Sequence, residues 1–191
     1  MTYALTPSVP AVDAYILQAP TSDREIASLL MSPDLIARSL EHATSLIEKG
    51  EAKTVMPTNL LPGIFTTPVT AYRWYSLVSE GGDDDFFSSD LAASTLAATF
   101  GKLDKPTLII MSEKDEMVPD TVDKRALLER WVECIPEAFR GNEQEHVRKL
   151  RGGIIPGADH ELSSAWGRGV FAECVVGFLM GLEGGGAEKR S

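Results

Sequence analysis

The sequence predicts an α/β fold in which short parallel strands alternate with helices. Three apolar segments, residues 12–17, 107–111 and 150–155, have strand length, and each is followed by turn residues. Segments with helical periodicity or helix-start signals lie between and after them. Strands that are separated in this way by helices pair in parallel, so the order is typical of an α/β layer protein.

The composition limits the classes of function. A chain of 191 residues with 43% hydrophobic residues is long enough for one globular domain. A net charge of −10 argues against binding to nucleic acid or to an anionic membrane. The two cysteines, Cys134 and Cys174, do not indicate a disulfide framework. The three histidines show no metal-ligand spacing with each other or with the cysteines, so we expect no metal and no cofactor.

The N-terminal residues contain no basic region followed by an apolar run, and no segment reaches the ~18 apolar residues of a membrane span. We therefore expect a cytoplasmic protein without membrane partners. The sequence does not predict an oligomeric state.

The first predicted strand, residues 12–17, is ended by the sequence QAP at 18–20. Thr21 or Ser22 can then cap a helix, because acidic residues follow in its first turn. Pro33 opens a second predicted helix, which stops near Gly50.

Residues 50–90 differ in character from the rest and are predicted to form an inserted lid. Three prolines forbid a long helix there, and aromatic residues gather without strong periodicity. Residues 81–87 read as a turn, after which Ser88 or Ser89 is predicted to cap a helix that runs through Phe100. The aromatic residues are candidates for the wall of an acyl or hydroxamate pocket, although such side chains more often pack in a core. They are Tyr72, Trp74, Tyr75, Phe86 and Phe87.

The central feature of the sequence is the segment PTLIIMSEKDEMVP at residues 106–119. Residues 107–111 are predicted to form a strand buried on both faces, and the turn that follows places Asp115 just beyond its carboxyl end. In open parallel sheets the carboxyl ends of the strands carry the chemistry, so Asp115 is a candidate site residue by position. A helix is predicted over residues 121–135, and a polar segment with a short helix within 143–148 follows.

The last predicted strand, residues 150–155, is followed by PGADHEL, which places His160 just beyond its end. An aspartate and a histidine at the ends of neighbouring strands are two thirds of a catalytic triad. A closing helix is predicted over residues 163–182, and residues 183–191 are predicted to be a disordered tail. Three strands alone leave a sheet edge open, so we expect an exposed apolar edge and marginal stability.

Four segments of the chain resemble one known family. They are residues 16–25, 70–91, 106–119 and 154–162, and they resemble the C-terminal portion of a fungal branch of the α/β-hydrolase superfamily, catalogued as DUF1749. The similarity covers nearly all of residues 1–182. It implies a partial α/β-hydrolase fold, with the last three parallel strands, flanking helices and an inserted lid.

The resemblance also implies a chemistry. Complete relatives look like serine hydrolases that cleave ester or related acyl bonds in small molecules, and some members of the branch are linked to hydroxamate siderophores. In such enzymes the triad follows the chain order Ser, Asp, His. By this resemblance Asp115 is the acid that orients the imidazole, and His160 is the general base.

One part of the family pattern is missing. No G-x-S-x-G sequence, the elbow that carries the nucleophile, occurs in the 191 residues, and MTYAL at residues 1–5 looks like the helix that follows this elbow. We therefore expect the chain to begin inside that helix. Three hypotheses stay open: a truncated serine hydrolase, an inactive remnant that binds a ligand or partner, and a chain completed by another polypeptide.

Simpler roles compete for several of these residues. Asp115 could cap a turn or helix, His160 could be a loop histidine, and Asp159 is the nearest rival acid. The run of aspartates at 83–85 is more typical of a solvated turn than of a metal site, because consecutive side chains seldom converge on one ion. Ser22 lies near the end of the first strand but has no elbow to direct it, so it is not a predicted nucleophile.

Overall fold

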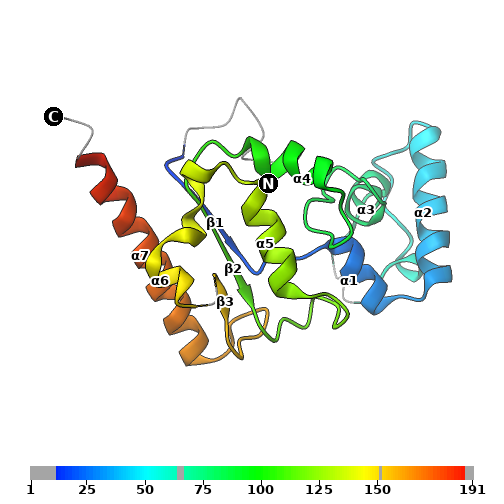
Figure 1. The fold of residues 1–191 in the computed structure, drawn as a ribbon. Helices are drawn as coiled ribbons and strands as arrows, with labels where there is room; N and C mark the ends of the chain where they lie inside the picture. Colours follow the sequence, from blue (N-terminus) through cyan, green and yellow to red (C-terminus); the bar gives the residue numbers. More distant parts are fainter. Residues whose placement is uncertain (1–11, 64–66, 151, 188–191) are drawn as a thin grey trace. The chain divides into compact units, whose positions relative to one another are not determined.

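The computed structural model describes residues 12–63, 67–150 and 152–187, and these form two compact units (Figure 1). The sheet unit contains the described residues up to Pro20, Leu91–Glu116, and the described residues from Asp120 onward. The helical unit contains Thr21–Asp90 and Met117–Pro119. The helix expected at residues 1–5 lies outside the described residues.

The sheet unit is built on three parallel strands in the order β1-β2-β3. They are β1 (Tyr15–Gln18), β2 (Thr107–Ser112) and β3 (Ile154–Ile155). The register pairs Gln18 with Ile110, and Ser112 with Ile155, so all three carboxyl ends lie at the same edge of the sheet. This arrangement confirms the α/β class that the sequence predicts.

All six residues of β2 are buried, as its continuous apolar sequence predicts. Leu108 and Ile110 belong to a core cluster with Cys174 and Phe178 of the last helix. Ile109 and Met111, which point to the opposite face by the alternation of a strand, are at most 1% exposed. In Figure 1 helices α5 and α7 flank the strands, and both contact β2. The central strand is therefore held from two sides.

The helices and short 3-10 turns of the sheet unit are α4 (Ala93–Thr99), η3 (Phe100–Lys102), α5 (Lys124–Cys134), η4 (Glu137–Phe139), η5 (Gly141–Glu143), α6 (Glu145–Arg148) and α7 (Ala165–Ala187). Helix α5 begins where Asp123 accepts hydrogen bonds from the backbone N–H groups of Arg125 and Ala126. Its Trp131 stacks on Phe100 with ring centroids 5.7 Å apart. The predicted helix at residues 121–135 is thus present and slightly shorter.

The two outer strands differ from the prediction in length. The last strand is predicted over residues 150–155 but contains only Ile154–Ile155. Gly152 and Gly153 have φ of 75° and 116°, and the carbonyl of Leu150 accepts hydrogen bonds from the N–H groups of Gly153 and Ile154. The chain therefore turns where a strand is expected. The first strand also begins later than predicted, at Tyr15 rather than at residue 12.

Strand β1 pairs only with β2 among the described residues. Its Ile16 is 37% exposed although it is a large apolar side chain within a strand. This exposure agrees with the open apolar edge expected from three strands. The marginal stability that was expected along with it stays a prediction.

The predicted cap at Ser88 or Ser89 is wrong. Helix α4 begins at Ala93, and its N-terminal residue Ala92 makes no side-chain cap. The two serines instead bind carboxylates in the helical unit, where the hydroxyl of Ser88 donates to Asp85 and that of Ser89 donates to Glu25. Both hydroxyls therefore bind carboxylates, and neither caps α4.

Helix α7 is longer and more apolar than expected. It continues to Ala187, beyond the predicted boundary at residue 182, and residues 188–191 lie outside the described part. Its segment Ala165–Leu182 has a mean hydropathy of 1.3, so by length and composition it could cross a membrane, contrary to the expectation from sequence. One such helix is weak evidence of a span, and here Cys174 and Phe178 pack against the sheet. The absence of membrane partners stays a prediction.

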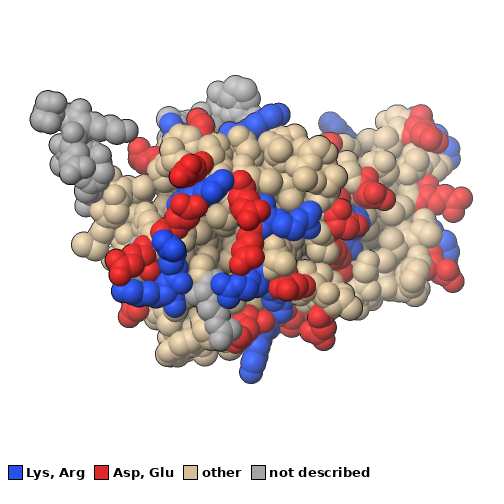
Figure 2. All heavy atoms as spheres, viewed as in Figure 1, with Lys and Arg blue, Asp and Glu red and all other residues tan. Residues whose placement is uncertain are grey.

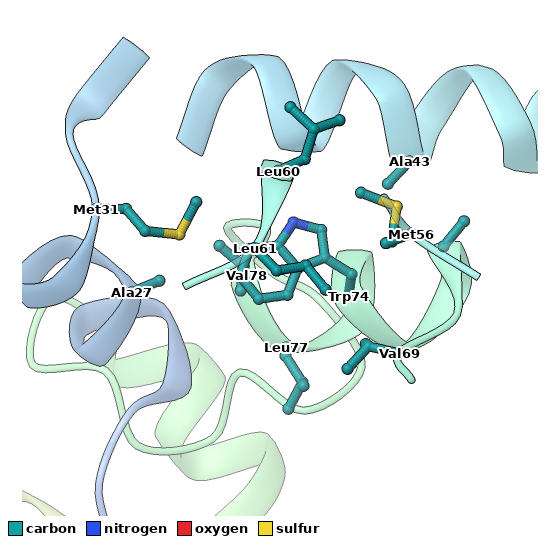
Figure 3. Packing of buried hydrophobic residues seen from close by; sticks show 11 residues of the cluster. Ala27, Met31, Ala43, Met56, Leu60, Leu61, Val69, Trp74, Leu77 and Val78 are labelled. Atoms are coloured by element: carbon teal, nitrogen blue, oxygen red, sulfur yellow. The ribbon is translucent and has the colours of Figure 1, made fainter. Parts of the chain in front are cut away.

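The helical unit contains α1 (Asp23–Leu30), α2 (Pro33–Glu48), the 3-10 turn η2 (Thr58–Leu60) and α3 (Ala71–Val78). The caps are those the sequence predicts for α1 and α2, because Ser22 accepts a hydrogen bond from the N–H of Glu25 and Pro33 opens α2. Figure 3 shows the core that these helices enclose around Trp74.

Helix α3 is absent from the prediction. It has only eight residues and lies in the segment expected to be irregular, but Thr70 caps it by accepting from the N–H of Arg73. It packs along α2. The compact unit therefore begins at Thr21, well before the predicted insertion at residues 50–90, because α1 and α2 share one core with α3.

A buried polar network orders the acidic turn of the helical unit. The side chain of Asp85 is 1% exposed; it forms an ion pair with Nε of Arg24 at 3.2 Å and accepts from the N–H of Gly81 at 3.1 Å. The hydroxyls of Ser22 and Ser88 lie 2.6 Å apart beside it. The turn at residues 81–87, which the sequence predicts, is thus fixed by charge pairing.

The two cysteines provide a test of how α7 packs. Cys174 is 1% exposed, and burial, with a smaller contribution from Glu173, raises the pKa of its thiol, whereas Cys134 is partly exposed. We expect Cys134 to react with a thiol reagent roughly 100-fold faster than Cys174 in the folded chain, with equal rates in denaturant. Stopped-flow labelling measures this ratio, and Cys134→Ser and Cys174→Ser identify each phase. Two equally fast thiols in the folded chain would contradict the packing of α7 on the sheet.

The visible face of the molecule mixes charges of both signs. Figure 2 shows Lys and Arg side chains interspersed with Asp and Glu, without a continuous basic field on that face. Together with the net charge of −10, this gives nucleic acid no electrostatic attraction there. The absence of nucleic-acid binding stays a prediction.

Candidate active site

Asp115 and His160 meet at the carboxyl edge of the sheet. Nδ1 of His160 lies 3.1 Å from each carboxylate oxygen of Asp115. The aspartate side chain is 1% exposed and the histidine side chain is 29% exposed. In the neutral imidazole, a carboxylate facing Nδ1 favours the tautomer with the proton on Nδ1, which leaves the lone pair of Nε2 free to accept a proton.

The turn after β2 places the aspartate. β2 ends at Ser112, and the N–H of Asp115 donates to the carbonyl of Ser112 at 3.3 Å, which closes a tight polar turn. Because β2 is buried on both faces, the turn is anchored to a rigid strand. The position predicted from the pattern of a buried strand and a polar turn is therefore present.

The histidine loop is bound to the aspartate loop along its length. The N–H of Glu113 donates to the carbonyl of Ile155 at 3.0 Å, and the N–H of Lys114 donates to that of Ala158 at 2.8 Å. The carboxylate of Glu113 accepts from the N–H of Gly157 at 2.7 Å. Gly157 has φ of 66°, which a side chain would disfavour, so the glycine permits the turn that brings His160 over Asp115.

The rival acid is engaged elsewhere. The carboxylate of Asp159 accepts a hydrogen bond from the N–H of Ser163 at 2.7 Å, and the hydrogen bonds from Ser163 hold the pKa of Asp159 below its usual value. It therefore caps the turn that precedes α7. Among the carboxylates of the described residues, Asp115 is the one that forms a hydrogen bond with the imidazole.

Two residues at the site were not predicted to belong to it. The side-chain amide of Gln18 donates to the carbonyl of His160 at 2.9 Å, and the carboxylate of Glu116 accepts from the N–H of His160 at 3.1 Å. The one signal in the sequence is position, since Gln18 ends the first strand and Glu116 follows Asp115. The hydrogen bonds of His160 in the described part of the chain are to Gln18, Asp115 and Glu116, none of which supplies a hydroxyl.

The predicted pocket residues all lie in the helical unit, with different surroundings. Trp74 has no exposed surface, and its indole N–H donates to the hydroxyl of Ser39 at 3.0 Å. A side chain without accessible surface cannot line an open pocket, so Trp74 is a core residue. Tyr72 and Tyr75 are 49% and 38% exposed. Phe86 and Phe87 are half-buried and meet edge to face, with ring centroids 6.4 Å apart.

The acidic run at residues 83–85 divides among separate partners. Asp83 accepts from the hydroxyl of Tyr72, Asp84 binds Arg73 and Asp85 binds Arg24. Within the described residues no group of three or more His, Cys, Asp or Glu side chains is placed to hold a metal ion. Ser22 is 6% exposed and engaged as a cap.

Comparison with known proteins places the chain in a family context. Residues 1–180 match the model of a family described as a protein of unknown function, DUF1749. Similar curated proteins include a UPF0613 protein of Schizosaccharomyces pombe, 34% identical over 78% of this chain and 48% of that protein. The fusarinine C esterase sidJ of Aspergillus fumigatus is 32% identical over 90% of this chain and 55% of that protein. An esterase of Emericella nidulans is 31% identical over 83% of this chain and 49% of that protein.

A solved structure shares the fold. The siderophore hydrolase EstB from Aspergillus fumigatus matches 94% of this chain and 62% of its own, with a TM-score of 0.71 and 32% identity. This similarity confirms the partial α/β-hydrolase fold, with strands β1 to β3 and their flanking helices. The chain spans about half the length of the curated relatives it matches.

Proposed function

Because this chain belongs to the DUF1749 family and has part of the α/β-hydrolase fold, we propose that it carries the acid and base of a serine-type ester hydrolase. The observation that carries the proposal is the contact of Nδ1 of His160 with the buried carboxylate of Asp115. A general base needs a carboxylate bound to one ring nitrogen and a side chain that a substrate can reach, and the side chain of His160 is 29% exposed.

In the proposed reaction, Nε2 of His160 takes the proton of a serine hydroxyl as the oxygen attacks the ester carbonyl. The positive imidazolium that forms is stabilised by the negative charge of Asp115. The same proton then passes to the leaving alkoxide, which departs as an alcohol and leaves an acyl-serine. A water molecule, deprotonated by His160, then attacks the acyl carbon. The bond between this carbon and the serine oxygen breaks, the carboxylic acid leaves, and His160 returns the proton to the serine oxygen.

The serine itself is not assigned to any residue of the 191. The sequence contains no G-x-S-x-G, and the described hydrogen bonds of His160 include no hydroxyl. We therefore propose that the nucleophile and its oxyanion hole come from polypeptide outside these residues, either a longer form of the same protein or a second chain.

The substrate class comes from the relatives. One is named a fusarinine C esterase and another a siderophore hydrolase, so we propose small-molecule esters, with esters of hydroxamate siderophores as the first class to test. The insertion at residues 50–90 stays the proposed lid, with the exposed rings of Tyr72 and Tyr75 and the half-buried Phe86 and Phe87 as candidate substrate contacts. A cytoplasmic location belongs to the same proposal.

A second function is favoured by the missing elbow. A chain that keeps the acid and base without a nucleophile could act as an inactive remnant that binds a ligand or a partner. In that case the contact between Asp115 and His160 persists as a structural hydrogen bond.

An esterase assay separates the two functions. We expect this chain to be inactive on p-nitrophenyl acetate and butyrate, and a form extended upstream in its own reading frame to be active. In the extended form, His160→Ala and Asp115→Asn are each expected to reduce kcat on the order of 10⁴-fold, because either change removes the oriented base.

The matched control is Asp159→Asn, which removes the neighbouring carboxylate that caps the turn before α7. It is expected to retain activity within about tenfold, since its hydrogen bonds lie outside the catalytic pair. No activity in the extended form would favour the binding function. Turnover by the 191-residue chain that requires His160 would show that the nucleophile lies within it.

A further inference from the structure

We propose that Gln18 and Glu116 are positioning residues that hold the backbone of His160 above Asp115. This inference rests on the proposed function for its meaning in catalysis, but its geometry can be tested without any turnover. We call the two residues the backbone clamp. Both hydrogen bonds are made to the backbone of His160, so each residue acts through the position that it gives to the histidine.

The amide of Gln18 joins β1 to the loop that follows β3, and these two strands are not neighbours in the sheet. Gln18 is the last residue of β1, and the sheet order β1-β2-β3 separates it from the strand that leads to His160. Its Nε2 donates to the carbonyl of His160 at 2.9 Å, across the end of β2. The histidine loop is therefore attached to the far strand, β1, as well as to the adjacent strand, β2.

Glu116 binds the same residue from the segment that follows the middle strand, β2. Its Oε2 accepts from the N–H of His160 at 3.1 Å, one residue after the aspartate that binds the ring. Both backbone polar groups of His160 are therefore bound by side chains, while Nδ1 is bound by Asp115. With its backbone fixed at both ends, the histidine keeps only its side-chain torsions, and Asp115 selects among these.

Backbone strain at the same place points to an enforced geometry. The non-glycine residues with positive φ in the described part of the chain are Ala19 at 42° and Leu162 at 55°. Ala19 directly follows Gln18, and Leu162 lies two residues after His160. Such conformations persist where surrounding contacts determine them, and they are concentrated at functional sites. Both strained residues thus flank the contact between Gln18 and His160.

Local stability does not require the clamp. Gln18 and Glu116 are both exposed, and the histidine loop has other bonds to the β2 turn, including those to Glu113 and Lys114. The clamp therefore adds precision to a loop that is already attached. A displacement of about 1 Å at a reacting group can reduce a rate roughly 100-fold, so such precision has a catalytic use.

The test follows the Nδ1 proton of His160 by NMR in the 15N-labelled 191-residue chain, with His160→Asn to assign the signal. We expect Gln18→Met and Glu116→Ala each to accelerate exchange of this proton with water about tenfold, the factor for one lost hydrogen bond of ordinary strength. Glu116→Gln keeps a carbonyl oxygen as acceptor and is expected to restore the slow exchange. Met keeps the length of Gln18 without its donor.

The matched control is Glu129→Ala, which removes an exposed carboxylate of the sheet unit that pairs with Arg125. It is expected to leave the exchange unchanged. Unchanged exchange in both Gln18→Met and Glu116→Ala would overturn the proposal. Equal acceleration in Glu116→Ala and Glu116→Gln, or a loss of signals throughout the sheet unit, would also overturn it, because the residues would then be general structural contacts. If the exchange rates change as expected but no form of the chain has esterase activity, the clamp is supported and the proposed function is rejected.

Discussion

Replacing Gly153 with alanine is expected to destabilise the chain by roughly 2–4 kcal/mol, because backbone strain and steric overlap add. Gly153 has φ of 116°, a conformation that residues with a Cβ rarely adopt. A Cβ there would lie 2.6 Å from the carbonyl oxygen of Ile109 and 2.6 Å from Nδ2 of Asn142. Both are closer than contact distance, and the first is a backbone atom of the central strand.

The overlap affects hydrogen bonds that join β2, η5 and the turn before β3. The buried side chain of Asn142 accepts from the N–H of Ile109 at 2.9 Å and donates to the carbonyls of Ile109 and Gly152 at 2.6 and 2.7 Å. The carbonyl of Gly153 itself accepts from the N–H of Met111. Displacing Gly153 therefore strains these bonds and moves the start of β3, which leads to His160.

Gly152→Ala is the matched control for this change. Gly152 also has a positive φ, 75°, but a Cβ there would meet no atom within 4 Å. It is expected to cost only the strain, about 1 kcal/mol. Urea unfolding followed by circular dichroism gives both values. If the two alanines were equally destabilising, the close approach of Gly153 to Ile109 would be contradicted.

The geometry of the candidate site was predictable where one strand determines it. The buried strand and the polar turn that follows it identify Asp115, and the rule for parallel sheets brings His160 to the same edge. The lengths of the elements were less predictable. Residues 150–153 look like a strand by composition, but the positive φ of two glycines and the bonds to Leu150 turn the chain there. Glycine permits such a turn, but its presence in the sequence does not predict one.

The missed helix and the missed clamp have different physical causes. Helix α3 is short, follows a proline-rich segment, and owes its stability to packing against α2, which local propensity does not report. The contact of Gln18 with His160 joins residues 142 positions apart. No sequence pattern predicts which residue a glutamine at the end of a strand will bind, so this contact is visible only in the folded sheet.

Trp74→Ala is expected to reduce the free energy of unfolding by about 3–5 kcal/mol, the usual cost of deleting a fully buried indole. Trp74 has no exposed surface and lies among the side chains that α1, α2, η2 and α3 contribute to one cluster (Figure 3). Leu60, Leu61 and Val78 belong to the same cluster and are labelled in Figure 3. The cavity left by the ring would be lined by side chains from several elements, which cannot all collapse into it.

Trp74→Phe separates the volume of the ring from its hydrogen bond. Phenylalanine fills most of the space but cannot donate to Ser39, whose hydroxyl still donates to the carbonyl of Ile36 at 2.7 Å. Because no buried group loses its last partner, the cost is expected to be about 1–2 kcal/mol.

Trp166→Ala is the matched control, since this tryptophan is 56% exposed at the start of α7 and its removal is expected to change stability by less than about 0.5 kcal/mol. Urea midpoints for the three variants give the order Trp74→Ala, Trp74→Phe, Trp166→Ala in decreasing cost. If Trp74→Ala were as mild as Trp166→Ala, Trp74 would not be a core residue. Its predicted place in a substrate pocket would then have to be considered again, because a ring that contributes little to folding is free to serve a ligand.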